Sequence, residues 1–256
     1  KTYRALCVSM AEAELSERLQ AKAEASHRAE QGAEDEHRID PHLAFVKLCN
    51  DAYKIQDVIE GLQNLPSDAR FDFVEVDPPY DAAFDYKYDV TKQEIYGNRT
   101  YSQFMKEVID GAYQSMRANS FMICWFPTRE YTMFFETLEA IFGQKQVDPI
   151  PAIWYKETQP AGDIERMLAR RYESFFVAWK GKPVLQLKGL PNIFEYNTVP
   201  SSARWHPVQR PIDLMIRLHE IFCPSFGNTL IPFAGSGTPI NAHFLRNPSP
   251  GSCISF

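Results

Sequence analysis

The sequence lacks the features that would place it among secreted, zinc-binding or membrane-spanning proteins. Its 256 residues include only five cysteines, an odd number with no pair at Cys-x-x-Cys spacing, which argues against a disulfide framework and against a zinc site. No apolar run approaches the roughly 20 residues of a membrane span, and no signal peptide opens the chain. We therefore expect a protein of a reducing compartment, with no membrane and no metal.

An excess of positive charge is also absent. Acidic residues outnumber basic ones by 33 to 27, for a formal net charge of -6. This balance counts against a nucleic-acid partner, but such binding needs only a local basic surface. Hydrophobic residues at 45% and aromatic residues at 13% exclude a disordered chain. The missing Met at position 1 indicates a fragment, a processed chain or part of a longer protein.

Residues 71–80 indicate a buried strand that ends in an unusual turn. The apolar, β-branched run is followed by Asp77, Pro78, Pro79 and Tyr80. The two prolines form a stiff corner with carbonyl acceptors, to which Asp77 adds a charged acceptor and Tyr80 a flat face. An exocyclic amine on a nucleobase offers two hydrogens and a ring to stack, which these groups match. Taken alone, the tetrapeptide is equally typical of a strand that ends in a proline turn.

A second unusual turn follows an expected strand near the end of the chain. Residues 232–238 read Pro-Phe-Ala-Gly-Ser-Gly-Thr, between a strand at 227–231 and a helix at 240–245. The two glycines allow positive φ and let a ligand approach the backbone, with helix N–H groups directed at it. A lone Gly-x-Gly is weak evidence. Two strand ends with unusual turns would, however, open on one crevice of an α/β sheet.

The remaining chain predicts alternating helices and strands. We expect further strands at 43–51, 120–126, 151–155 and 174–179, and helices at 58–62, 101–116, 131–142 and 212–222. The order strand, helix, strand at 43–76 is typical of the start of a parallel sheet. Residues 11–38 indicate an exposed, charged helix, and residues 81–100 a lid or a poorly ordered loop.

The most basic part of the chain surrounds the expected strand at 174–179. Its cations are Arg166, Arg170, Arg171, Lys180 and Lys182. A solvated charged face and a patch that contacts DNA phosphates are equally compatible with this stretch. The second interpretation would let these residues position a duplex without reading its sequence.

Together, the tetrad and the glycine turn resemble the amino-methyltransferases that modify exocyclic nitrogens of DNA bases with S-adenosylmethionine. The tetrad comes first and the glycine turn later, as in the permuted β class of that family. The resemblance covers roughly residues 43–256. Further matching segments are Asn50-Asp51, Trp154-Tyr-Lys156, residues 172–181 and His206-Pro-Val-Gln-Arg-Pro211.

The resemblance implies an α/β, Rossmann-like methyltransferase fold with a mostly parallel central sheet, helices on both faces and a circularly permuted motif order. It implies a catalytic domain at 41–256, and the charged helix expected before it makes residues 1–40 an N-terminal helical arm. The family inserts its target-recognition region where this chain has only the connector 183–205. A target-recognition region this small predicts a short recognition site or relaxed sequence preference.

The resemblance also implies the reaction and the residues that perform it. A methyl group would pass from S-adenosylmethionine to N6 of adenine in duplex DNA after base flipping, with no metal. The setting would be the cytoplasm of a bacterial or phage-infected cell, with a homodimer as a possible assembly. Catalysis would fall to Asp77, Pro78, Pro79 and Tyr80. Cofactor binding would fall to Asp51, Gln209, Arg210, Pro232, Phe233, Ala234, Gly235, Ser236, Gly237 and Thr238.

Two departures from the family pattern bear on the cofactor. Ile231 stands where the family has Asp, which predicts a weaker or rearranged cofactor site. The chain ends at Phe256, just where an acid that grips the ribose would come, which indicates truncation.

Several alternatives remain open. Asp77 favours adenine, but Asp occurs in cytosine-N4 enzymes as well. Related tetrads also serve RNA and protein glutamine, and a non-catalytic DNA-binding subunit could retain the fold.

Overall fold

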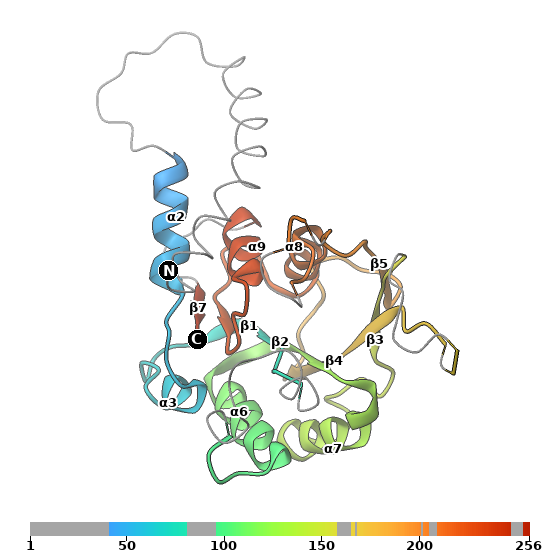
Figure 1. Ribbon diagram of the computed structural model, residues 1–256. Coiled ribbons are helices and arrows are strands. Elements are labelled where there is room, and N and C mark those ends of the chain that lie inside the picture. The colour runs from blue at the N-terminus through green and yellow to red at the C-terminus, as the bar shows by residue number, and fades with distance from the viewer. Residues whose placement is uncertain are drawn as a thin grey trace, which may run out of the picture.

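The centre of the computed structural model is one seven-stranded sheet (Figure 1). The structure describes residues 41–80, 96–157, 165–166, 168–200, 202–204, 209–246 and 253–256. The strand order across the sheet is β5-β3-β4-β2-β1-β6-β7. The bounds are β1 Phe71–Val76, β2 Met116–Phe126, β3 Ala152–Tyr155, β4 Tyr172–Lys180, β5 Ile193–Glu195, β6 Thr229–Ile231 and β7 Cys253–Ser255.

Most neighbouring strands of this sheet run parallel. Strand β1 pairs in parallel with β2 and β6, β6 with β7, and β3 with β5. Strand β4 is the exception, because it runs antiparallel to both β2 and β3. The predicted mostly parallel α/β fold is therefore confirmed.

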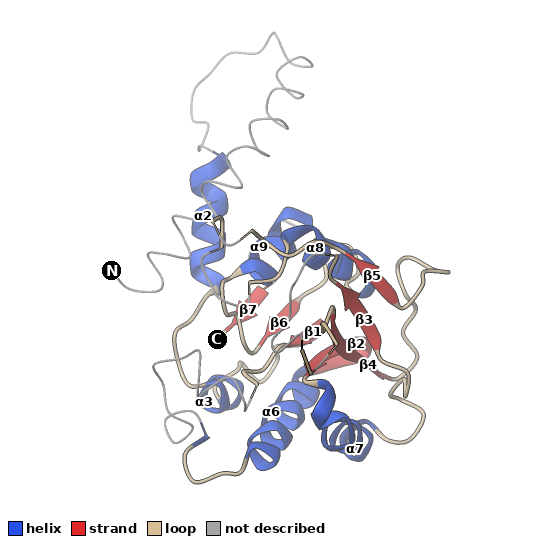
Figure 2. Ribbon diagram, turned by 45° about the vertical axis from the view of Figure 1, so that its right-hand side comes forward, coloured by secondary structure: helices blue, strands red, loops and turns tan. Residues whose placement is uncertain are grey.

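Helices cover both faces of the sheet (Figure 2). On one face lie α3 (Val58–Gln63), α6 (Tyr101–Ser115) and α7 (Tyr131–Phe142), the last preceded by a short 3-10 turn η2 (Thr128–Glu130). On the other lie α8 (Ile212–Phe222) and α9 (Thr238–Arg246). Successive residues of β1 serve the two faces alternately. Val74 packs in the core under α6, whereas Phe73 packs under α8.

The structure corrects the strand predicted at 43–51, which is part of helix α2 (Pro41–Ala52). A short apolar run does not distinguish a strand from a buried helix by periodicity, and proline is well tolerated in the first helical turn. Helix α2 contacts α9, and its Phe45 packs in one core cluster with Ile231 and Phe244. The parallel sheet therefore does not begin with a strand at 43–51.

The other predicted helices and strands of the described region are confirmed within a few residues. The connector 183–205 holds one addition, strand β5, which pairs with β3. The predicted arm at 1–40 and most of the predicted lid, residues 81–95, lie outside the described residues. None of the helices described is long and apolar enough to cross a membrane.

Candidate active site

The tetrad and the glycine turn lie side by side at one edge of the sheet. Strands β1 and β6 are parallel neighbours, with Val74 opposite Leu230. The chain leaves β1 into residues 77–80 and leaves β6 into residues 232–238, so both turns follow carboxyl ends. In open α/β sheets, ligands bind outside this edge. The sequence predicted this juxtaposition, and the strand register confirms it.

The carboxylate of Asp77 is held by a buried arginine. Arg210 donates from Nε to Oδ2 of Asp77 at 2.7 Å and from Nη2 to Oδ1 at 2.6 Å. This is the two-pronged geometry in which a guanidinium and a carboxylate fit best. The hydroxyl of Tyr80 lies 3.5 Å from Nη2. Arg210 therefore touches the first and last residues of the tetrad.

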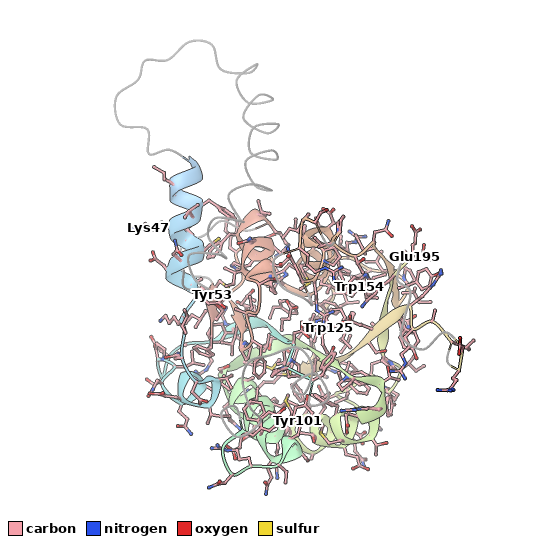
Figure 3. The ribbon with its side chains drawn as sticks, viewed as in Figure 1. Lys47, Tyr53, Tyr101, Trp125, Trp154 and Glu195 are labelled. Atoms are coloured by element: carbon pink, nitrogen blue, oxygen red, sulfur yellow. The ribbon has the colours of Figure 1, made fainter. Side chains whose placement is uncertain are left out.

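The guanidinium of Arg210 is fixed from two further directions. Its Nη1 donates to Oε2 of Glu173 at 2.5 Å, and its central carbon lies 3.6 Å from the centroid of the Trp125 ring. The Trp154 ring lies 5.7 Å away, and both tryptophans sit on the sheet face under α8 (Figure 3). Lys156 pairs with the other oxygen of Glu173. We call Lys156, Glu173, Arg210 and Asp77 the charge network.

The charges of this network alternate in sign, and they shift the pKa values of Glu173 and Arg210. Burial alone would raise the pKa of Glu173, but the charges of Arg210 and Lys156 lower it to about 2. Burial would lower the pKa of Arg210, yet Asp77 and Glu173 outweigh it and raise that pKa well above its ordinary value. Burial, with the nearby carboxylates, also raises the pKa of Tyr80 well above normal. Glu173 and Arg210 are therefore ionised, and the Tyr80 hydroxyl keeps its proton.

Next to this network lies a buried acid that is neutral below about pH 8. Glu75 is fully buried in β1 and accepts a hydrogen bond from Nε1 of Trp125 at 3.3 Å. Its other oxygen has no hydrogen-bond partner among the described residues. Burial, followed by the charge of Asp77, raises the pKa of Glu75 to about 8.

The glycine turn leaves open space beside its backbone. Gly235 and Gly237 have φ values of 53° and 78°, and a β-carbon at either position would meet nothing within 4 Å. The N–H of Gly237 donates to the carbonyl of Ala234 at 2.8 Å, which closes the turn. The hydroxyl of Tyr53 donates to the carbonyl of Gly235 at 3.1 Å. A cofactor can therefore lie directly against this backbone, as the glycines predict.

The other residues of the turn support its shape. Phe233 packs near Phe104, with 6.2 Å between ring centroids, and the hydroxyls of Ser236 and Thr238 are 2.8 Å apart. Pro232 and Ala234 are buried. Ile231, which replaces the family's Asp, is fully buried in the core cluster with Phe45. The side chain at this position therefore serves packing.

Three predicted cofactor contacts precede this turn in the sequence and lie in other parts of the fold. Asp51 is exposed at the end of α2, two residues before Tyr53. Gln209 is half-buried beside Arg210. The side chain of Arg210 contacts Asp77, Glu173 and Tyr80, and its predicted contact with the cofactor stays a prediction. Its place follows from the start of α8, which brings residue 210 beside the carboxyl ends of β1 and β2.

The five predicted phosphate contacts do not form one patch. Arg166, Arg170 and Arg171 are exposed just before β4, whose first residues pair with the carboxyl end of β2. Lys180 ends the same strand and lies opposite Ser120, at the other edge of the sheet. Nine residues of strand separate these edges by about 27 Å.

The ammonium group of Lys180 forms hydrogen bonds and a ring contact within the fold. It donates to the carbonyls of Tyr113 and Met116 at 3.0 and 3.2 Å and lies over the Tyr113 ring. Desolvation by burial, the larger cause, and the charge of Arg70 lower its pKa. Lys182 is exposed at the same edge. Only the three arginines therefore lie at the edge that carries the tetrad.

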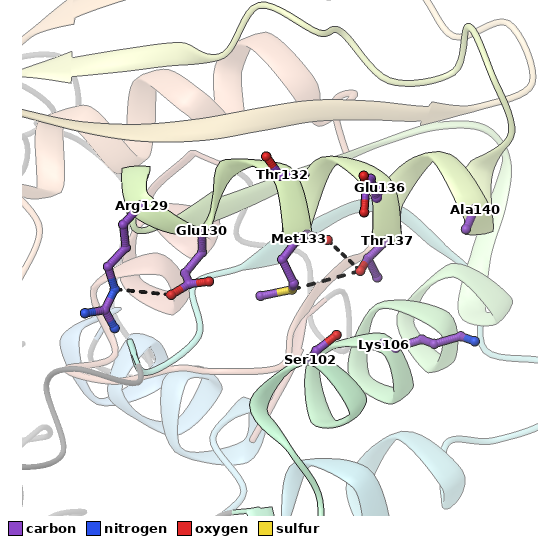
Figure 4. Close-up of a pocket in the computed structure, with 9 residues that line it drawn as sticks. All are labelled: Ser102, Lys106, Arg129, Glu130, Thr132, Met133, Glu136, Thr137 and Ala140. Atoms are coloured by element: carbon purple, nitrogen blue, oxygen red, sulfur yellow. Dashed lines mark hydrogen bonds and ion pairs between the residues drawn. The ribbon is translucent and has the colours of Figure 1, made fainter.

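A surface groove of about 460 Å³ lies between α6 and α7 (Figure 4). Its lining mixes charges of both signs, and Arg129 pairs there with Glu130 at 3.2 Å. The hydroxyl of Thr137 is bonded to the carbonyl of Met133 within α7. The groove lies on the face opposite α8 and contains none of the predicted site residues, so the tetrad is the better candidate for chemistry.

Several residues of the site were not predicted from the sequence. They are Tyr53, Glu75, Trp125, Trp154, Lys156 and Glu173. A signal existed for three of them, because Trp154, Lys156 and Glu173 belong to segments that resemble the family. The resemblance marked these segments without assigning a role to any side chain in them.

Comparison with known proteins agrees with this geometry. The model of a family described as DNA methylase, N6_N4_Mtase, matches residues 71–243. The putative methylase YubD of Escherichia coli (strain K12) is 24% identical over 192 residues, which cover 71% of this chain and 74% of that protein.

Solved structures share the fold at low identity. The M1.HpyAVI-SAM complex superimposes with a TM-score of 0.59 at 19% identity, over 78% of this chain and 89% of the other. The PvuII DNA methyltransferase, cytosine-N4-specific, gives a TM-score of 0.61 at 14% identity, over 79% of each chain.

Proposed function

This chain belongs to the N6_N4 DNA methylase family, and we propose that it transfers the methyl group of S-adenosylmethionine to N6 of adenine in DNA. The observation that carries the proposal is the position of the tetrad. Asp77, Pro78, Pro79 and Tyr80 follow a central strand, directly beside a glycine turn with open space along its backbone. A group of hydrogen-bond acceptors thus adjoins a place for a cofactor.

The tetrad can activate an amino nitrogen by accepting its two hydrogens. The lone pair of such a nitrogen is delocalised into the base. Hydrogen bonds to the Asp77 carboxylate and the Pro78 carbonyl favour a pyramidal nitrogen and concentrate the lone pair for attack. Stabilisation that grows toward the transition state accelerates the reaction, and positioning contributes the rest.

Pairing with Arg210 leaves Asp77 able to accept this amine. A carboxylate offers about four lone-pair sites, of which the guanidinium occupies two. The Asp77 side chain is 25% exposed, against 6% for Arg210, so the remaining acceptor sites are accessible. Because the amine cannot reach them from inside a duplex, the base must be flipped out, and Tyr80 offers a surface on which it can stack.

The turn at 232–238 and Tyr53 would hold the cofactor. S-adenosylmethionine, when bound, supplies an electrophilic methyl group. The open backbone at Gly235 and Gly237 accommodates it, and Tyr53 fixes the carbonyl of Gly235. Because the buried Ile231 offers no charged contact there, we expect binding of the cofactor to depend on the backbone and on apolar contacts.

Adenine is proposed as the base because Asp occupies the first position of the tetrad. The alternative is N4 of cytosine, which the name of the PvuII enzyme records for that protein. Arg166, Arg170 and Arg171 would contact DNA phosphates, because they are exposed at the edge of the sheet that carries the tetrad.

The test is to incubate the protein with S-adenosylmethionine and unmethylated genomic DNA of mixed sequence, and to analyse the digested nucleosides by mass spectrometry. We expect N6-methyldeoxyadenosine, in an amount that reports how relaxed recognition is. N4-methyldeoxycytidine would establish the cytosine alternative. Methylation of RNA or protein alone, in parallel reactions, would refute DNA as the substrate. DNA binding without any methylation would indicate a non-catalytic subunit.

A further inference from the structure

We propose that Arg210 is a positioning residue for methyl transfer, which holds the Asp77 carboxylate and the Tyr80 hydroxyl in the arrangement that receives the flipped base. The inference rests on the proposed function, because it assigns a role within that reaction.

The first argument is the geometry of the Arg210–Asp77 pair. Two parallel hydrogen bonds of 2.7 and 2.6 Å fix the plane of the carboxylate as well as its distance. A single bond would leave that plane free to turn about the side chain. A lysine at this position would supply a point charge but no planar fork. Arg210 therefore fixes the direction of the acceptor sites that remain on Asp77.

The second argument is that Arg210 is itself immobilised. Glu173 accepts from Nη1 at 2.5 Å, and the ring of Trp125 lies 3.6 Å from the guanidinium carbon. Lys156 holds Glu173 from the other side. A residue that positions another must be locked by its own packing and hydrogen bonds. Arg210 meets that condition through groups on β2, β4 and the end of β3.

The third argument is the energetic cost of the network. Removing four charges from water is expensive, and well-packed apolar residues of similar volume are often equally stabilising. Stability alone therefore does not account for a buried arginine between two carboxylates. The need to fix a carboxylate at the reacting centre accounts for this arginine, because small errors in placement there reduce catalysis strongly.

The test compares Arg210→Lys and Arg210→Ala with Arg217→Ala, a matched control on α8 whose arginine pairs with Glu220 away from the network. Each is assayed for methyl transfer to DNA and for S-adenosylmethionine affinity by calorimetry. We expect kcat to fall about 100-fold in both Arg210 variants, with KM for DNA and the cofactor Kd within about twofold of wild type. Glu173→Gln, which keeps the Arg210–Asp77 pair, should lose less activity.

Chemical rescue separates positioning from a structural role. Methylguanidine can refill the space left in Arg210→Ala, so millimolar concentrations should restore much of its kcat and raise its melting temperature. The same additive should do neither for Arg217→Ala. The lysine variant keeps the positive charge and provides a folded protein if the alanine variant does not fold.

Three outcomes would overturn the proposal. Full activity of Arg210→Lys would show that the planar fork is unnecessary. Loss of cofactor affinity in step with kcat would return Arg210 to the cofactor site. Rescue by methylguanidine of melting temperature but not of kcat would show a structural role. An inactive wild type would refute the proposed function itself, whereas these three results arise only with an active wild type.

Discussion

The carboxylate of Asp77 serves two partners, Arg210 on one side and the proposed amine on the other. Asp77→Asn replaces one oxygen with an NH2 group, which faces the arginine's donors and breaks one of the two bonds. We expect kcat for DNA methylation to fall at least about 100-fold, in line with the loss of one preorganised hydrogen-bond group. Cofactor affinity, measured by calorimetry, should stay within about twofold.

Asp72→Asn is the matched control for that variant. Asp72 lies on the same strand but near its other end, where it accepts from the N–H of Asn228 at 2.9 Å and from Arg117 at 3.1 Å. The variant Asp72→Asn should leave kcat unchanged. An equal loss of activity in both variants would mean that the effect comes from damage to β1.

Glu75 makes stability depend on pH in a predictable direction. Its pKa is raised from 4.5 to about 8 in the folded protein, so between these values the folded state binds a proton that the unfolded chain releases. Its contribution to stability is therefore full below pH 4.5 and is lost as pH rises through 8. Above pH 8 the folded protein must hold a buried carboxylate beside Asp77.

Glu75→Gln removes this titration while keeping the side-chain shape. We expect the variant to gain unfolding free energy relative to wild type as pH rises from 5 to 9, on the order of a few kcal/mol. Urea denaturation at the two pH values measures it. The interpretation fails if the difference between variant and wild type is the same at both.

Helix α6 begins at a capping box that was not predicted from the sequence. The hydroxyl of Thr100 accepts from the N–H of Gln103 at 3.2 Å, and the side chain of Gln103 accepts from the N–H of Thr100 at 2.8 Å. These bonds satisfy two N–H groups that the first turn of a helix leaves without partners. They anchor the helix whose Phe104 packs near Phe233 of the glycine turn.

Thr100→Ala should cost about 1 kcal/mol of unfolding free energy, measured by urea denaturation. Ser102→Ala, an exposed position in the same turn with no part in the box, is the control and should change stability by less than about 0.5 kcal/mol. Equal effects of the two variants would argue against the cap.

The two edges of the sheet differ in what they offer to DNA. Arg170 and Arg171 are exposed at the edge that carries the tetrad, and Lys182 at the opposite edge. Each phosphate contact contributes about 0.9 to the slope of log affinity against log salt for duplex DNA. We expect the double variant Arg170→Ala, Arg171→Ala to weaken binding and to lower that slope by up to about 2.

Lys182→Ala is the corresponding control, since it removes a positive charge just beyond the far end of β4, a strand about 27 Å long. Fluorescence anisotropy with a labelled duplex at several salt concentrations measures both. If Lys182→Ala weakens binding as much as the arginine variant, the DNA does not approach from the tetrad edge.

Several parts of the fold could be predicted from local sequence pattern. The buried strand before Asp77, the glycine turn and most helices follow from apolar periodicity and from the special backbone chemistry of proline and glycine. The order of those motifs indicated the family. Within the described residues, periodicity predicted the wrong element at 43–51, because an apolar run of that length suits a buried helix as well as a strand. It also did not predict the three-residue strand β5.

The distant side chains that share the site could not be predicted in this way, because the fold of the whole sheet brings them together. Arg210 and Asp77 are 133 positions apart, and nothing in the local sequence at either one specifies the other. The antiparallel course of β4 brings Glu173 to the tetrad edge and carries Lys180 to the opposite one. Strand direction and register fix such pairs, and these depend on the packing of the whole sheet, which no local stretch of sequence contains.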